Sequence, residues 1–232
     1  MNQKTTIQIK SDIKLTTYKF NSQFQERGSF AEEVDNKVIK NETMFFNCDL
    51  DFAYKHGNEI TRSFIDALPD DWKTCDTVFD SRVHMLMPKW IPCIYGVHHD
   101  DVPRPNGGQP DYDNPSYLSE HIMGSVNADI CPTQFYIGEA EFDKVTTGEN
   151  IYKVWHEEVL QKAEKGELQA VDAKDRTLIQ FDWQTWHTGV LARQNGWRWF
   201  GRLSRNTDRT KHITNEIRRQ TQVYMDNLTE GW

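Results

Sequence analysis

The chain has 232 residues, a formal net charge of −8 and a mean hydropathy of −0.76. This length is sufficient for a domain with a buried core, and no apolar run approaches the roughly 18 residues of a membrane-spanning helix. The start of the chain lacks the basic residues and apolar stretch of a signal peptide, so we expect a cytoplasmic protein.

Four cysteines, Cys48, Cys75, Cys93 and Cys131, lie far apart in the sequence without CxxC spacing. This spacing favours reduced structural thiols over a disulfide framework or a zinc cluster.

The first forty residues are polar and weakly patterned, with one edge strand expected at 6–10. A helix is expected after Asn58, because Asn58 can cap it, apolar residues recur on one face as far as Leu68, and Pro69 ends it. No repeat or linker divides the chain, so we expect a single domain over 1–232. Its parts are an N-terminal extension and helix (1–74), a core (approximately 75–205) and a C-terminal helix (206–232, helical from about 214 to 227).

The expected core consists mainly of strands. Strands rich in Val, Ile, Tyr and Trp are predicted at 77–87 and 90–98, and others at 133–139, 177–183, around His187 and at 196–204. An amphipathic helix is predicted at 150–165, and a loop rich in proline and glycine at 102–117 is either a lid or a surface excursion. Short, irregularly spaced strands favour a mainly β fold with flanking helices, a jelly-roll sandwich or barrel, over βαβ units.

The string His98-His99-Asp100-Asp101 ends the predicted strand 90–98. Residues i and i+2 of a strand point the same way, so His98 and Asp100 are expected on one face and His99 and Asp101 on the other. His187, which follows another apolar run, is the best candidate for a third ligand. Two imidazoles and one carboxylate are typical of non-haem iron(II) sites, although this string taken alone also fits a solvated turn.

Arg198 and Arg202 share one face of the predicted strand 196–204. A guanidinium group aimed into an apolar interior is costly unless an anion meets it, and arginine is suited to holding a carboxylate with two hydrogen bonds. The alternative is a surface strand whose arginines form ion pairs.

In this order and spacing, His98-x-Asp100, then His187, then Arg198 resemble the iron(II)- and 2-oxoglutarate-dependent dioxygenase superfamily. The resemblance covers approximately residues 75–205. It implies a double-stranded β-helix, which is a jelly roll, with Fe(II) bound by His98, Asp100 and His187. It also implies that Arg198 binds the distal carboxylate of the cosubstrate 2-oxoglutarate.

The same resemblance suggests supporting residues and a reaction. Thr133 or Gln134 is a candidate for an assisting hydroxyl or amide, and Arg202 for a contact with the cosubstrate or an anionic substrate group. The implied reaction is hydroxylation of a C–H bond in a small molecule, with decarboxylation of 2-oxoglutarate to succinate. Halogenating members have a small residue where this chain has Asp100, which argues against halogenation.

Two other classes remain open: a non-catalytic jelly roll that binds a metal and a ligand, and, less favoured, a zinc-dependent hydrolase. The expected partner is a small molecule, which an anionic group would suit because basic residues are concentrated at 193–219. Nucleic acid is less favoured at a net charge of −8, and no membrane partner is expected.

Overall fold

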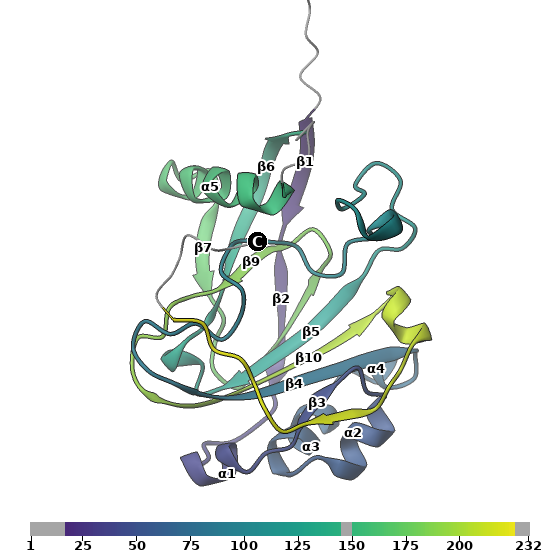
Figure 1. Ribbon diagram of the computed structural model, residues 1–232, viewed down its shortest axis with the longest axis vertical. Helices are drawn as coiled ribbons and strands as arrows, with labels where there is room; N and C mark the ends of the chain where they lie inside the picture. Colours follow the sequence, from purple (N-terminus) through teal and green to yellow (C-terminus); the bar gives the residue numbers. More distant parts are fainter. Residues whose placement is uncertain (1–16, 145–149, 226–232) are drawn as a thin grey trace, which may run out of the picture.

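The computed structural model describes residues 17–144 and 150–225 (Figure 1). Its strands are β1 (Thr17–Ser22), β2 (Phe24–Ser29), β3 (Met44–Phe46), β4 (Thr77–Leu86), β5 (Glu120–Val126), β6 (Thr133–Asp143), β7 (Gln169–Asp172), β8 (Thr177–Asp182), β9 (Trp186–Gly189), β10 (Gly196–Arg205) and β11 (Glu216–Arg218). Its α-helices are α1 (Asn36–Lys40), α2 (Leu50–His56), α3 (Glu59–Asp66), α4 (Asp70–Lys73) and α5 (Ile151–Glu164), and its 3-10 turns are η1 (Pro105–Gly107), η2 (Ala128–Ile130) and η3 (Asp208–Lys211).

Two antiparallel sheets form the body of the molecule. The larger has the strand order β2-β8-β5-β10-β4, and the smaller has the order β1-β6-β7 with β9 also paired to β6. The expected mainly β fold with flanking helices is therefore confirmed. Neither sheet closes on itself within the described residues, and β1 and β2, from the expected N-terminal extension, contribute one strand to each sheet.

Helices α1–α4 lie against the larger sheet (Figure 1). Phe64 of α3 is fully buried, with its ring centroid 5.6 Å from that of Phe79 on β4 and 5.7 Å from that of Trp199 on β10. The helix predicted after Asn58 is confirmed, but its first turn is capped by another residue. The buried carboxylate of Glu42 accepts hydrogen bonds from the backbone N–H groups of Asn58 (2.8 Å) and Ile60 (3.0 Å), which satisfies donors that a helix start leaves unpaired.

Helix α5 packs on the smaller sheet through a second core. The Asn150 side chain caps the helix by accepting from the N–H of Tyr152 (3.1 Å), and Gly166, with φ of +76°, follows its end. Trp155 and Trp186 are completely buried here, and Trp183 is 8% exposed. The two tryptophans near His187 therefore belong to the core.

Two predicted elements are wrong. The segment 90–98 forms only isolated bridges, Ile91 with Tyr224 and His98 with His187, because Pro92 lacks an N–H group and Gly96 has φ of +127°. The C-terminal helix is also wrong for the described residues. After Asn215, with φ of +53°, the chain extends as β11 and pairs with β3.

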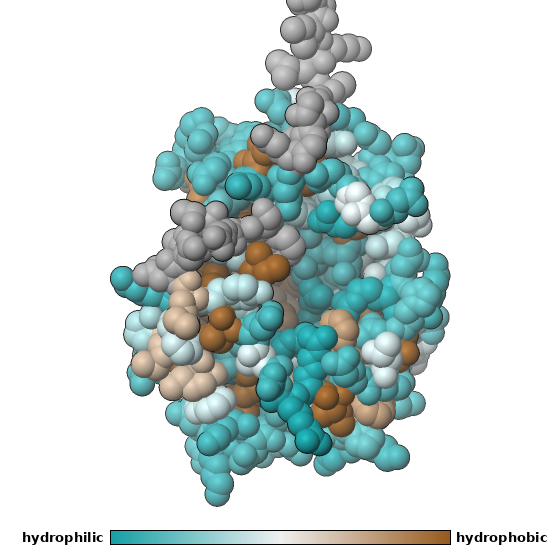
Figure 2. Space-filling view, viewed as in Figure 1, coloured by the Kyte–Doolittle hydropathy of each residue, from teal (hydrophilic) through white to brown (hydrophobic). Residues whose placement is uncertain are grey.

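The remaining strand and helix predictions agree with the structure to within a few residues, except that the edge strand expected at 6–10 lies outside the described residues. All four cysteines are free. Among the described helices, none has the length and apolar character required to cross a bilayer. The face in Figure 2 is largely hydrophilic, with hydrophobic side chains in small separate groups.

Candidate metal centre

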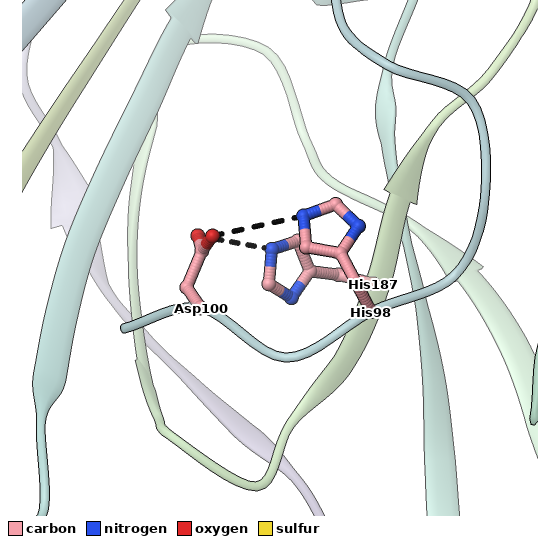
Figure 3. A group of neighbouring side chains, drawn as sticks. All are labelled: His98, Asp100 and His187. Carbon is pink, nitrogen blue, oxygen red and sulfur yellow. Dashed lines mark hydrogen bonds and ion pairs between the residues drawn. The ribbon is translucent and has the colours of Figure 1, made fainter. Parts of the chain in front are cut away.

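His98, Asp100 and His187 come together in the structure (Figure 3). One potential ligand atom from each lies within 4.8 Å of the others. The Nε2 atom of His187 is 3.1 Å from Asp100 Oδ2, and that of His98 is 3.6 Å from Asp100 Oδ1. The three side chains can hold a metal ion, as the sequence predicted.

The two histidines are held by backbone pairing, whereas Asp100 is not on a strand. The His98 N–H donates to the His187 carbonyl at 3.0 Å, and the His187 N–H donates back at 3.2 Å. Asp100 follows in an irregular segment, where the Ser119 hydroxyl donates to the carbonyls of Asp100 and Asp101 at 3.3 and 3.2 Å. The i, i+2 relation thus brings His98 and Asp100 together without the strand from which it was predicted.

Hydrogen bonds fix the ring orientation of both histidines. His98 Nδ1 lies 2.8 Å from the Gly96 carbonyl, and His187 Nδ1 lies 2.9 Å from the Thr185 carbonyl. Since carbonyls only accept, each Nδ1 carries a proton, and a neutral ring then presents the Nε2 lone pair to Asp100. Burial lowers the pKa of His98, which favours that neutral form. This second layer of hydrogen bonds is characteristic of histidines that bind metals.

The triad of His98, Asp100 and His187 lines a cavity of about 430 Å³ between the two sheets. Its walls include side chains from β4, β5, β8 and β10 of the larger sheet and from β6 and β9 of the smaller one. Of the two candidates for an assisting hydroxyl or amide, Thr133 lines this cavity and Gln134 does not. The Gln134 amide donates to Asp172 and accepts from Tyr136, so it is engaged elsewhere.

Arg198 is the most unusual charge in this cavity. It is 3% exposed, and its Nη2 donates to the Ser125 hydroxyl at 2.9 Å. Its Nε has no hydrogen-bond partner, and it forms no ion pair with any carboxylate of residues 17–144 or 150–225. Burial lowers the pKa of Arg198, and the more distant charge of Asp175 offsets this effect only in part. The cavity therefore contains a cation that an anionic ligand would satisfy.

Arg202 lies in the same cavity but faces Asp100. Its Nη1 donates to Asp100 Oδ2, and its Nη2 is 3.7 Å from Asp80 Oδ2. Burial would raise the pKa of Asp100, but the positive charge of Arg202 holds it well below the usual value. In this structure, then, Arg202 contacts a candidate metal ligand.

The other basic residues of 193–219 are mostly neutralised. Ion pairs join Arg193 to Asp172, Arg205 to Asp71 and Glu120, Arg209 to Asp80 and Asp101, Lys211 to Asp208, and Arg218 to Glu216. This arrangement differs from a continuous basic strip of the kind that binds nucleic acid.

A second cavity, of about 740 Å³, also reaches His98 and Asp100. It is lined by part of the loop 102–117, and Arg104 of this loop lies over the ring of Tyr152 at 5.5 Å. The loop is thus placed beside the candidate centre, the position that a lid would require. Nothing in the sequence pattern pointed to Tyr152 or to Asp80 as neighbours of the site.

His99 lies apart from the triad, as strand alternation predicted. It is 4% exposed, its Nδ1 is 2.8 Å from the Tyr112 hydroxyl, and its ring centroid is 3.6 Å from that of Trp186. His99 is therefore part of the packed core behind the candidate ligands.

Comparison with protein-family models and with curated proteins gives no match to this chain.

Proposed function

We propose that the protein is an Fe(II)- and 2-oxoglutarate-dependent oxygenase that hydroxylates a C–H bond of a small molecule, built on a double-stranded β-helix. One observation carries the proposal: a His-Asp-His group and a buried arginine without an acidic partner line the same cavity. A metal ion with open positions and a site for a carboxylate are the two features that this chemistry requires.

The donor set fits iron(II). His98 and His187 offer neutral imidazole nitrogens, and Asp100 offers a carboxylate oxygen. A metal ion between the Asp100 carboxylate and the two Nε2 atoms would be bound by all three groups. Two histidines and one carboxylate are the protein ligands that non-haem iron(II) oxygenases use, and they leave positions for other ligands.

The rest of the cavity fits a dicarboxylate. Arg198 can hold one carboxylate with two parallel hydrogen bonds, and Thr133 offers a hydroxyl in the same wall. The metal would take the other end of the molecule. Met123, Phe181 and Phe200 form apolar parts of the lining, which would limit the access of water to the reacting atoms.

Iron(II), when bound with 2-oxoglutarate and oxygen, supplies the oxidising chemistry that converts a C–H bond to C–OH and 2-oxoglutarate to succinate and carbon dioxide. The residues of the chain have simpler tasks. His98, Asp100 and His187 hold the metal, Arg198 anchors and orients the cosubstrate, and the packed sheets keep both in a fixed relation. A substrate would reach the metal from the cavity beside the loop 102–117.

The test is an anaerobic titration of the metal-free protein with Fe(II) and then with 2-oxoglutarate, followed by calorimetry and absorbance. We expect saturable binding of both. Arg198→Met is expected to weaken 2-oxoglutarate binding by about 100-fold or more, because charged hydrogen bonds contribute about 1.5–3 kcal/mol each, and to leave metal binding nearly unchanged. Equal loss of both would show that Arg198 is structural.

Two outcomes would favour the other classes. Retention of Zn(II) without any 2-oxoglutarate binding would reject the oxygenase and favour a zinc hydrolase. Binding of Fe(II) and 2-oxoglutarate that never yields succinate under oxygen, with any substrate supplied, would favour a non-catalytic binder.

A further inference from the structure

We propose that Arg202 is a positioning residue of the metal centre, which holds the Asp100 carboxylate in the orientation that binds the metal. The inference rests on the metal-binding part of the proposed function and is independent of 2-oxoglutarate. It assigns to Arg202 a different role from that of Arg198, four residues earlier on the same strand.

The Asp100 side chain needs this support because few hydrogen bonds fix the backbone around it. His98 and His187 are fixed by reciprocal backbone hydrogen bonds, but Asp100 lies beyond this bridge in an irregular segment. The next residue, Asp101, has φ of +46°, so the chain turns away at this point. Ser119 holds the backbone carbonyls of both aspartates but does not contact the Asp100 carboxylate.

Arg202 supplies the missing restraint from the opposite sheet. It lies on β10, directly across from Asp80 on β4 and from Met123 on β5, and its side chain reaches Asp100. The segment that contains Asp100 lies next to β9 of the smaller sheet, and this contact connects it to the larger sheet. The contact therefore sets the position of the one candidate ligand whose backbone lies outside the bridge between His98 and His187.

Arg202 is itself held in place. Its Nη2 lies 3.7 Å from Asp80 Oδ2, and Asp80, which is 7% exposed, accepts a hydrogen bond of 2.9 Å from the Asn47 N–H and one of 2.6 Å from Arg209 Nη2. Arg209 continues to Asp101 at 3.4 Å. The charges, of which Asp80 is buried and the others are partly buried, thus alternate in sign from Asp100 to Asp101, which offsets the cost of their burial.

These contacts distinguish Arg202 from Arg198. The terminal nitrogens of Arg202 are directed to Asp100 and Asp80, whereas the Arg198 guanidinium contacts the Ser125 hydroxyl and the Phe200 ring and has no carboxylate partner among the described residues. An incoming carboxylate would have to displace existing ion pairs at Arg202 but none at Arg198. Arg198 is therefore the residue that would bind the anionic ligand, and Arg202 is the residue that positions Asp100.

The test is titration of metal-free protein with Co(II) alone, read by calorimetry and by the visible absorption of the bound ion. Arg202→Met is expected to weaken Co(II) binding by about 10–100-fold and to alter the absorption, as loss of a group that orients a metal ligand does. Arg202→Lys keeps the charge but cannot bridge two carboxylates, so its affinity should fall between those of Arg202→Met and the wild type.

Arg205→Met is the matched control. Arg205 is on the same strand and also joins two carboxylates, Glu120 and Asp71, but it lies outside the cavity. We expect its Co(II) affinity to equal that of the wild type. Urea unfolding of each variant shows whether the metal-free fold is retained, and Arg202→Lys maintains the test if Arg202→Met does not fold.

The outcomes distinguish the two proposals. If the wild type binds no Co(II), the metal-binding part of the proposed function fails. If the wild type binds Co(II) and both Arg202 variants bind it equally well or more tightly, Arg202 is not a positioning residue. Loss of 2-oxoglutarate binding with unchanged Co(II) binding in these variants would instead make Arg202 a cosubstrate anchor.

Discussion

Replacing Arg198 with methionine should affect stability and ligand binding in opposite directions. Arg198 is 3% exposed, and the hydrogen-bond partner of its guanidinium group is the neutral hydroxyl of Ser125. Removing a charge of this kind from water costs several kcal/mol, and one hydrogen bond involving a charged group returns about 1.5–3 kcal/mol. Arg198→Met fills a similar length without the charge, so we expect the ligand-free protein to become more stable by roughly 1–3 kcal/mol.

This gain in stability should be largely offset when 2-oxoglutarate is present. A ligand at about 100 times its Kd stabilises the folded protein by about 2.7 kcal/mol, and the variant would lose this contribution from 2-oxoglutarate. The assay is urea unfolding of wild type and variant, with Co(II) in place of Fe(II), with and without 2-oxoglutarate.

Arg205→Met serves as the control, because Arg205 already has two acidic partners and lies over the Trp72 ring at 4.2 Å. We expect it to lose about 1 kcal/mol or less and to keep its response to 2-oxoglutarate. The reasoning is refuted if Arg198→Met is less stable than the wild type without ligand, or if it is stabilised equally by 2-oxoglutarate.

Three further predictions concern the ligands, the pH dependence and the core. His187→Ala should abolish stoichiometric Co(II) binding in calorimetry while the far-UV spectrum is retained; full binding would show that the metal lies elsewhere. Burial lowers the pKa of His121 to about 4, below the value of about 6.5 for a histidine in the unfolded chain. The contribution of neutral His121 to stability is therefore complete above about pH 6.5 and is lost as the pH falls toward 4. Urea unfolding of metal-free protein between pH 7 and 5 should therefore show a smaller loss of stability in His121→Gln than in the wild type, by roughly 2 kcal/mol at pH 5, and parallel curves would contradict this. Phe64→Ala should cost about 3–5 kcal/mol in urea unfolding, because the fully buried ring joins α3 to the larger sheet, and a cost below about 1 kcal/mol would mean that this packing is wrong.

The candidate ligands could be predicted because their chemistry is visible in the sequence. Histidine and aspartate two residues apart, with a distant histidine after an apolar run, indicate a metal site whether or not the carrier is a strand. The predicted strand 90–98 was wrong because Pro92 and Gly96 prevent regular pairing, although Ile91 and Val97 of this segment are buried.

Arg202 shows what sequence alone could not supply. Strand alternation correctly placed it on the same face as Arg198, and both line the cavity. Which of them meets an acid depends on Asp80 and Asp100, which are far away in the chain and are brought close only by the two sheets. The C-terminal segment is similar: extension as β11 depends on its pairing with β3, a contact that its local pattern does not contain.

The most direct measurement of the central claim is succinate formation when oxygen is admitted to protein loaded anaerobically with Fe(II) and 2-oxoglutarate. We predict that the wild type forms succinate slowly even without the natural substrate. His187→Ala should form none, and Arg198→Met should form it only at a much higher 2-oxoglutarate concentration. A wild-type protein that binds both Fe(II) and 2-oxoglutarate but forms succinate at the same rate as His187→Ala would contradict the assignment.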